Sequence, residues 1–312
     1  MRKILTLLLV LITVSTIDAK PRATNSELNL RIGTYNVWSV PAREWRFKKG
    51  DITKSRSWEN NKEAVAKLIV DLDCDLIGLQ EMSVENYEDL AKLIKKVGGK
   101  KYGLWWQNIY PESSKHIAGN AILYNKKKFK LSNQNVLYLS PTPTEISKGW
   151  DCKRHYRAAA TTIVTHKKSG KQFFFIATHG PLKKVANANA GRLLVEFDQT
   201  YNPKGLPAIV VGDMNARPGK AFHKTMCEYF DDSFLVAEKS CGIIGTFNGP
   251  GEVEANFSAS HRRIDHIYVR STDKGKITVK DYKVNRDKYV MPDGESHYPS
   301  DHNPVVVELK LK

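Results

Sequence analysis

The 312-residue chain is poor in cysteine, and it has no long apolar run beyond its N-terminal end. The four cysteines are too few and too irregularly spaced for a disulfide scaffold, and none forms a CxxC metal or redox motif. Cys227 and Cys241 are close enough in sequence to form one bridge, whereas Cys74 lies in an apolar segment and is expected to be buried. No segment after the N-terminus is long and apolar enough to span a membrane.

The first 19 residues differ in composition from the rest of the chain. Two basic residues precede an apolar run over residues 4–14, and a polar stretch then ends in Ala19. This layout predicts a secretory signal peptide over residues 1–19, with an uncleaved membrane anchor as the alternative. We therefore expect a secreted or periplasmic protein whose folded domain covers residues 28–312. We expect this mature chain to be a monomer without a membrane span.

Acidic residues are scarce relative to basic ones. The chain has 33 Asp and Glu against 49 Lys and Arg, which gives a formal net charge of +16. Such an excess attracts polyanions, including nucleic acid, acidic glycans and anionic lipid. The lysines are scattered in short runs, however, and this pattern is also typical of a solvated surface. The charge gives modest support to a phosphate-bearing substrate, with nucleic acid among the candidates.

Strand-like runs and amphipathic helical segments are mixed along the chain. Helices are predicted over 57–72, 84–97 and 185–201, the first with Ser57 as its N-cap. Alternating or β-branched runs predict strands over 30–38, 75–82, 120–125, 159–166, 172–179, 208–215, 264–269, 277–284 and 304–311. The sequence KKSGK at 167–171 predicts a hairpin turn. Hairpin and helical connections together predict one mixed-sheet α/β (α+β) domain, without repeats or linkers.

Polar side chains stand where the predicted strands give way to loops. They are Asn36, Glu81, His179, Asp213, Asn215, Asp265, Asp301 and His302. Polar residues at strand ends are typical of a site carried by a rigid scaffold. Each also has a structural alternative: a packed histidine, a turn-capping aspartate, or an Asp265 that pairs with Arg262 or Arg263.

These residue types suit a hard divalent cation and phosphoryl transfer. Mg²⁺ prefers oxygen ligands, with water and substrate phosphate completing its coordination. Glu81 and Asp301 can supply charge and Asn36 a neutral oxygen or an orienting hydrogen bond, while the Cys and paired His ligands typical of zinc are missing. Phosphoryl transfer also needs an aligned water, donors to the phosphoryl oxygens and help for the leaving oxygen. The residues that fit those tasks are Asp213, Asn215, His179 and His302.

At these residues the chain resembles the endonuclease/exonuclease/phosphatase superfamily, which includes deoxyribonuclease I, abasic-site endonucleases, deadenylases, inositol-polyphosphate 5-phosphatases and neutral sphingomyelinases. The matching phrases are TYNVW, DLIGLQEM, GNAILY, IATH, GDMNARP, RIDHIYV and SDHNPV. They occur in the family's order over nearly all of the mature chain, and GDMN followed by SDH is a highly specific combination. The phrases SWENNK, SKGWD, GTFNG and YPSDH resemble an exported bacterial branch.

The resemblance implies a four-layer sandwich, in which two mixed β-sheets pack face to face between helices. It implies that Glu81, Asn36 and Asp301 bind the divalent cation, Mg²⁺ or alternatively Mn²⁺ or Ca²⁺. It further implies a water-activating Asp213, an Asn215 that donates to the phosphate, and phosphate contacts by His179 and His302. Asp265 would fix the tautomer of His302.

The expected function is that of an exported, divalent-metal-dependent phosphoesterase that hydrolyses a phosphodiester, with a nuclease as the first candidate. The alternatives are a phosphomonoesterase, a sphingomyelinase-like lipid phosphodiesterase, and a binding module that kept the fold and lost the chemistry. One departure concerns His179. Deoxyribonuclease-like members carry an acidic residue before the GNAIL-type strand, but SKHIAGN (114–120) has no carboxylate. The acidic partner of His179 is therefore not identified.

Overall fold

The structure is a computed structural model that describes residues 27–38, 57–113, 118–240, 242, 245–249 and 262–312. The predicted signal peptide, residues 1–19, lies outside these ranges, as does Cys241. Export and the Cys227–Cys241 bridge therefore stay predictions. Cys74 is buried, as its apolar surroundings predicted.

Two six-stranded mixed sheets form the middle of the molecule. The first has the order β11-β14-β1-β2-β4-β3 and the second the order β5-β6-β7-β8-β10-β9. The first sheet consists of β1 (Leu28–Asn36), β2 (Leu76–Ser83), β3 (Tyr102–Trp106), β4 (Ala118–Asn125), β11 (Ile277–Val284) and β14 (Val305–Leu311). The second consists of β5 (Phe129–Tyr138), β6 (Ala158–His166), β7 (Gln172–His179), β8 (Ala208–Asp213), β9 (Asp231–Asp232) and β10 (Asp265–Arg270). A separate short pair is formed by β12 (Tyr289–Val290) and β13 (Ser296–His297).

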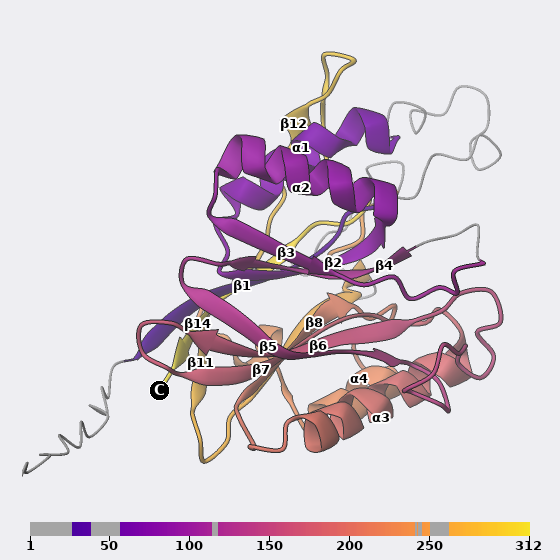
Figure 1. The fold of residues 1–312 in the computed structure, drawn as a ribbon, viewed down its shortest axis with the longest axis vertical. Helices are drawn as coiled ribbons and strands as arrows, with labels where there is room; N and C mark the ends of the chain where they lie inside the picture. The colour runs from indigo at the N-terminus through magenta and orange to yellow at the C-terminus, as the bar shows by residue number, and fades with distance from the viewer. Residues whose placement is uncertain (1–26, 39–56, 114–117, 241, 243–244, 250–261) are drawn as a thin grey trace, which may run out of the picture.

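Helices cover the outer face of each sheet (Figure 1). They are α1 (Trp58–Asp71) and α2 (Val84–Gly98) on the first sheet, and α3 (Lys184–Tyr201) and α4 (Ala221–Cys227) on the second, with the short α5 (Ser233–Val236) near β9. The Ser57 hydroxyl accepts from the Asn60 backbone N–H, so the predicted cap of α1 is confirmed. The four-layer α/β sandwich is therefore confirmed.

The two sheets pack directly against each other through apolar side chains from their inner faces. Gly78 on β2 shows how close this approach is. A Cβ atom there would lie 2.4 Å from Val211 Cγ2 and 3.1 Å from Ala177 Cβ of the opposite sheet. Only a residue without a side chain fits between these groups. A further apolar cluster lies between the first sheet and its helices, and another lies between the second sheet and its helices.

The long periodic segments follow the sequence prediction, and the weakly patterned ones do not. All three predicted helices and all nine predicted strands are present, with bounds shifted by a few residues. KKSGK forms the β6–β7 hairpin, with Gly170 at a φ of +73°. Among the elements not predicted are β5, which is largely polar because it lies at a sheet edge, and α4, which lacks a side-chain cap. Within the described ranges, no helix has the length and apolar character needed to cross a membrane.

Candidate active site

Strand directions bring the predicted site residues to one edge of the sandwich. β1 is parallel to β2, and β7 is parallel to β8, so the carboxyl ends of each pair lie side by side. Asn36 is paired in register with Gln80, and His179 with Asp213. The antiparallel strand β10 starts at this edge, where Asp265 is paired with Asp213.

Glu81 reaches the site because β2 contains a bulge. The register of β2 on β4 shifts between Leu79 and Met82, and Glu81 has a φ of +63°. Leu79 and Met82 both pack into the outer cluster under α1 and α2, although three positions separate them. The two residues between them, Gln80 and Glu81, are left for the other face of the strand. A positive φ at a non-glycine residue costs about 1–3 kcal/mol and is characteristic of functional sites.

Asn36 connects the two sheets. Its Nδ2 donates to Glu81 Oε1 at 3.2 Å on its own sheet and to Asp213 Oδ2 at 3.1 Å on the other. Its Oδ1 accepts from the Trp38 backbone N–H at 3.1 Å. Asp301 is close by, because the Ser300 hydroxyl donates to the Asn36 carbonyl at 2.7 Å and lies 3.5 Å from Asp301 Oδ1. Glu81, Asp213 and Asp301 are thus all arranged around Asn36.

Asp213 lies at the start of a tightly held turn. Its Oδ1 accepts from the Asn215 backbone N–H at 2.9 Å, and Asn215 has a φ of +48°. Asn215 Nδ2 donates to the Gly180 carbonyl at 3.0 Å. A Cβ on Gly180 would lie 2.3 Å from the Met214 carbonyl oxygen, so glycine is required where the segment after His179 crosses this turn.

Two histidines face the other carboxylate oxygen of Asp213. His179 Nε2 lies 3.3 Å and His302 Nε2 3.7 Å from Asp213 Oδ2. His302 Nδ1 lies 2.8 Å from Asp265 Oδ2, which also accepts from the Thr246 hydroxyl at 2.6 Å. Asp265 therefore contacts His302 and not Arg262 or Arg263. The acidic group in contact with His179 is Asp213 itself.

The electrostatics give the two histidines different charges. Burial alone would lower the pKa of His302, but the carboxylates of Asp265 and Asp213 raise it well above its ordinary value. Burial lowers the pKa of His179, and the nearby Arg157 adds to this effect. Burial raises the pKa of Asp265 to about 6, whereas His302 and His179 hold the pKa of Asp213 below its usual range against the effect of burial. At neutral pH, His302 is cationic, His179 neutral and Asp213 anionic.

The donor set at this edge fits a hard divalent cation. Glu81 and Asp301 offer carboxylate oxygens near Asn36, and the strained backbone at Glu81 directs one of them to the site. Asp213, Asp265 and His302 also offer ligand atoms within 4.8 Å of one another. In that second group, however, His302 Nδ1 and Asp265 Oδ2 are hydrogen-bonded to each other, so this nitrogen is not available to an ion.

The sequence of residues 33–302 matches the model of the endonuclease/exonuclease/phosphatase family. The chain belongs to this family. A family member from Bacteroides thetaiotaomicron is 26% identical, with a TM-score of 0.77 over 92% of this chain and 99% of that one. The mannosyl-6-phosphatase of the same species is 27% identical, with a TM-score of 0.75 over 90% of this chain and 99% of that one.

More distant structures share the fold. The human Nocturnin catalytic domain with bound sulfate is 19% identical, with a TM-score of 0.61 over 94% of this chain and 99% of that one. A search of curated protein sequences found no match. Members of the endonuclease/exonuclease/phosphatase family are phosphoric ester hydrolases, and the chain belongs to this class of enzymes.

All eight predicted site residues lie at this edge. Direct side-chain contacts join six of them: Asn36, Glu81, Asp213, His179, Asp265 and His302. Asn215 is joined to Asp213 through its backbone N–H, and Asp301 is joined to Asn36 through Ser300. Their catalytic and metal-binding roles stay predictions. Thr246, which accompanies Asp265, was not predicted as a site residue, although it lies in the GTFNG phrase.

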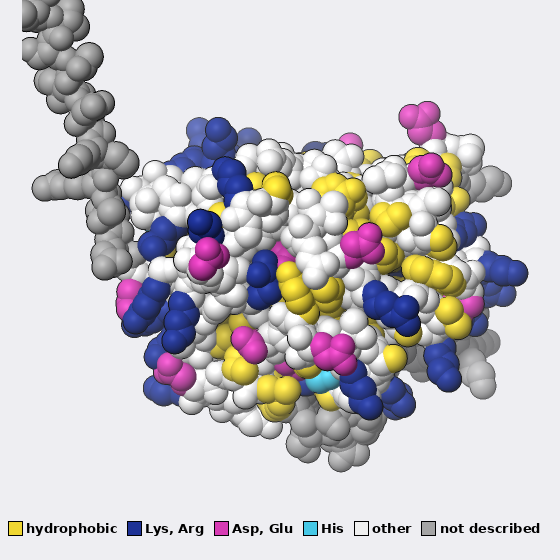
Figure 2. All heavy atoms as spheres, turned by 90° about the horizontal axis from the view of Figure 1, so that it is seen from below, with side chains coloured by type: hydrophobic (Ala, Val, Ile, Leu, Met, Phe, Trp, Pro, Cys, Tyr) yellow, Lys and Arg dark blue, Asp and Glu magenta, His cyan; other side chains and the backbone are white. Residues whose placement is uncertain are grey.

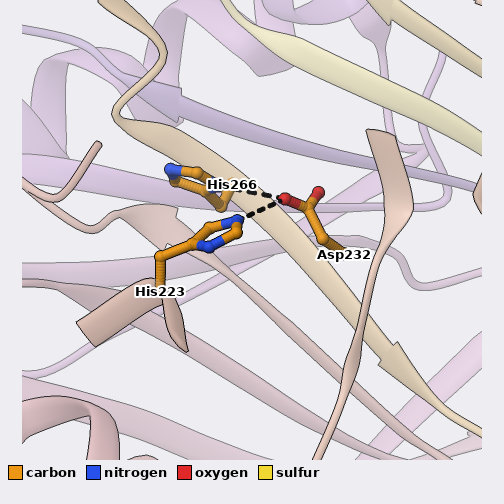
Figure 3. A group of neighbouring side chains, drawn as sticks. All are labelled: His223, Asp232 and His266. Carbon is orange, nitrogen blue, oxygen red and sulfur yellow. Dashed lines mark hydrogen bonds and ion pairs between the residues drawn. The ribbon is translucent and has the colours of Figure 1, made fainter. Parts of the chain in front are cut away.

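A second polar cluster, around His223, Asp232 and His266, is buried in the fold (Figure 3). His223 Nε2 lies 2.9 Å from Asp232 Oδ2, and Arg263 donates to both oxygens of Asp232 at 3.0 and 2.8 Å. His266, the neighbour of Asp265, accepts from Arg263 Nη1 at its Nδ1 and donates from Nε2 to the Ala216 carbonyl, at 3.2 and 2.9 Å. The cluster therefore ties β10 to the Asp213 turn. The sequence does not predict this cluster, because its members come from three segments, α4, β9 and residues 263–266, and form no motif.

The ligand atoms of this cluster are spaced closely enough for a metal ion, but hydrogen bonds already occupy them. The ligand atoms of His223, Asp232 and His266 lie within 4.8 Å of one another. A guanidinium can only donate, so Arg263 occupies the lone pair of His266 Nδ1. The Gly219 backbone N–H donates to His223 Nδ1 at 3.3 Å. Arg263 also already neutralises the buried Asp232 carboxylate, so this group is a complete ion-pair network.

This arrangement predicts that His266 makes stability depend on pH. Burial lowers the pKa of His266 in the fold, despite the nearby Asp232. The unfolded chain therefore binds the extra proton, so the contribution of neutral His266 is complete above pH ~6.5 and is lost as the pH falls. Below pH ~6.5, the free energy of unfolding of the natural chain should fall by up to about 1.4 kcal/mol more per pH unit than that of His266→Gln. Urea unfolding of both proteins between pH 7 and 5 measures this, and parallel curves would contradict it.

Proposed function

We propose that the chain is a Mg²⁺-dependent hydrolase of phosphate esters, and that the edge around Asn36 is its active site. The observation that carries the proposal is the bridge from Asn36 Nδ2 to Glu81 and Asp213, which joins the two sheets at the point where all the strand-end polar residues meet. Glu81 and Asp301 would hold the cation, and Asn36 would orient the carboxylates. Bound there, the cation would offset the negative charge of the phosphate.

In the proposed mechanism Asp213 accepts the proton of the attacking water. Its pKa is held low, which keeps it ionised, and its Oδ1 is fixed by the Asn215 backbone N–H. Cationic His302 stands 3.7 Å from the same carboxylate and is held by Asp265, so it can donate to a phosphoryl oxygen or the leaving oxygen. Neutral His179 and the Asn215 amide add donors to the phosphate. Arg157, which influences the pKa of His179, adds positive charge nearby.

The first substrate candidate is a phosphodiester, as in nucleic acid. The net charge of +16 supports it. The second candidate is the phosphomonoester of a sugar, which the 27% identity to a mannosyl-6-phosphatase supports. The export predicted from residues 1–19 is compatible with both and stays part of the proposal.

A substrate panel with and without chelator tests the proposal. The purified chain is incubated with bis(p-nitrophenyl) phosphate, single-stranded DNA, RNA and mannose 6-phosphate in Mg²⁺ and again in EDTA. We expect hydrolysis that disappears with EDTA and returns with added Mg²⁺, because the carboxylate-rich edge needs a cation to accept an anionic substrate. Hydrolysis that persists in EDTA would refute the metal dependence. Preference for mannose 6-phosphate over the diesters would select the second candidate.

A further inference from the structure

Three exposed apolar side chains lie next to the candidate active site. They are Trp150, Leu182 and Val185, with 36%, 68% and 49% of their surface exposed, and we call them the apolar rim. A single exposed apolar side chain is ordinary, but a group of them marks an interaction surface.

Backbone contacts place the members of the apolar rim together. The carboxylate of Asp151 accepts from the backbone N–H groups of Val185 and Ala186 at 3.1 and 2.8 Å. The loop that carries Trp150, the residue before Asp151, is therefore held to the first turn of α3. Leu182 is two residues before that helix. A fourth apolar residue, Ile146, lies on the same loop as Trp150 and is 55% exposed.

The apolar rim is also fixed to the active-site turn. Leu182 comes three residues after His179. Asn187 on α3 donates from its Nδ2 to the Pro181 carbonyl at 2.8 Å and to the Met214 carbonyl at 2.9 Å. The segment that carries Leu182 is thus bonded to the turn between Asp213 and Asn215. A surface that docks on the rim comes close to the phosphate site.

Exposed cations lie close in sequence to the members of the apolar rim. Those exposed on the same two segments are Lys148, Lys153, Arg154, Lys183 and Lys184. Glu145 is the exposed acidic residue there, and the Asp151 carboxylate is bonded to the amides of α3. Figure 2 looks at the molecule from the side on which α3 and α4 lie, and apolar side chains are seen there among Lys and Arg side chains, with Asp and Glu side chains between them.

We propose that the apolar rim and these five cations dock the protein on an anionic lipid surface. Apolar side chains that enter the interface and lysines that meet anionic headgroups are the two components of peripheral membrane binding. In LKKV (182–185), two exposed lysines lie between two exposed apolar residues, so the same short segment offers both components. Docking through the rim would turn the phosphate site towards the lipid headgroups. The proposal concerns where the enzyme acts, and holds for either substrate candidate.

Vesicle co-sedimentation of the purified chain tests the docking. We expect binding to vesicles of phosphatidylcholine with phosphatidylglycerol, and little binding to phosphatidylcholine alone. Each basic residue at an anionic surface strengthens binding by about fivefold. Lys183→Glu/Lys184→Glu should therefore weaken binding by at least about 25-fold. Leu182→Ser/Val185→Ser should also weaken it, because the apolar side chains that enter the interface are lost.

Matched controls separate the apolar rim from net charge and general hydrophobicity. Lys167→Glu/Lys168→Glu reverses an adjacent exposed pair in the β6–β7 turn, and Leu235→Ser/Val290→Ser removes two apolar residues that are 63% and 71% exposed. Both controls should bind vesicles nearly as the natural chain does. Equal losses in the controls and the rim variants, or no preference for anionic vesicles, would overturn the proposal.

A soluble substrate keeps this test independent of the proposed function. Hydrolysis of bis(p-nitrophenyl) phosphate should be the same in the natural chain and in both docking variants, because none of the hydrogen bonds and ion pairs described for the site involves residues 182–185. Vesicle binding without hydrolysis would refute the proposed function alone. Hydrolysis without vesicle binding would refute the docking alone.

Discussion

Replacing Asp213 with asparagine is expected to lower kcat by about 10²–10⁴-fold, the range typical of a lost general base. The amide has the size of the carboxylate and can still accept from the Asn215 backbone N–H, so the turn should persist. It cannot take a proton from water at neutral pH. KM should change little, because Glu81, Asp301 and the histidines are left in place to hold the cation and the phosphate.

Two comparisons make this result specific to proton transfer. Asp231→Asn changes an exposed aspartate on β9 and should leave kcat unchanged. Glu81→Gln should lower Mg²⁺ affinity in a calorimetric titration, whereas Asp213→Asn should bind the ion nearly as the natural chain does. If Asp213→Asn loses Mg²⁺ binding while Glu81→Gln keeps it, the roles assigned to these two carboxylates are wrong. Undiminished kcat in Asp213→Asn would remove Asp213 as the base.

The site could be predicted to a large extent because its residues interrupt strong local patterns. Asp213 ends the fully buried strand β8, Asn215 follows two residues later, and His179 ends the almost fully buried β7. A charged residue after such a run is costly unless it has a partner, which makes it conspicuous in a sequence. The family resemblance then supplied the fold, which composition alone gave only as mixed α/β.

The contact partners of several side chains could not be predicted from the sequence. Strict alternation would place Glu81 on the same face as Leu79, and only the β-bulge against β4 turns it to the site. Arg263 could be considered as a partner of Asp265, two residues away. It pairs instead with Asp232, which is distant in the chain and carries no motif. Local sequence patterns indicate which residues are buried and whether a segment is a helix or a strand. These contacts depend instead on which distant segments the fold brings together.

The buried Asp232–Arg263 pair leads to the largest expected effect on stability. Arg263 is 2% exposed and Asp232 3% exposed. Breaking a buried pair by removing one partner costs about 3–5 kcal/mol, because a charge is left without compensation. Asp232→Asn should therefore lower the free energy of unfolding by about this amount. The free energy of unfolding of a whole domain is about 5–15 kcal/mol, so this single substitution would remove a large part of it.

The double variant shows whether the loss comes from the uncompensated charge. Arg263→Met together with Asp232→Asn removes both charges and keeps similar volumes, so it should be more stable than Asp232→Asn alone, although it has lost more hydrogen bonds. Urea unfolding of the natural chain, of Asp232→Asn and Arg263→Met alone, and of the double variant gives the coupling energy. Lys67→Met, which removes an exposed partner of Asp71 on α1, should change stability by less than about 0.5 kcal/mol. A double variant less stable than either single variant would show that packing and hydrogen bonds, not charge balance, dominate this cluster.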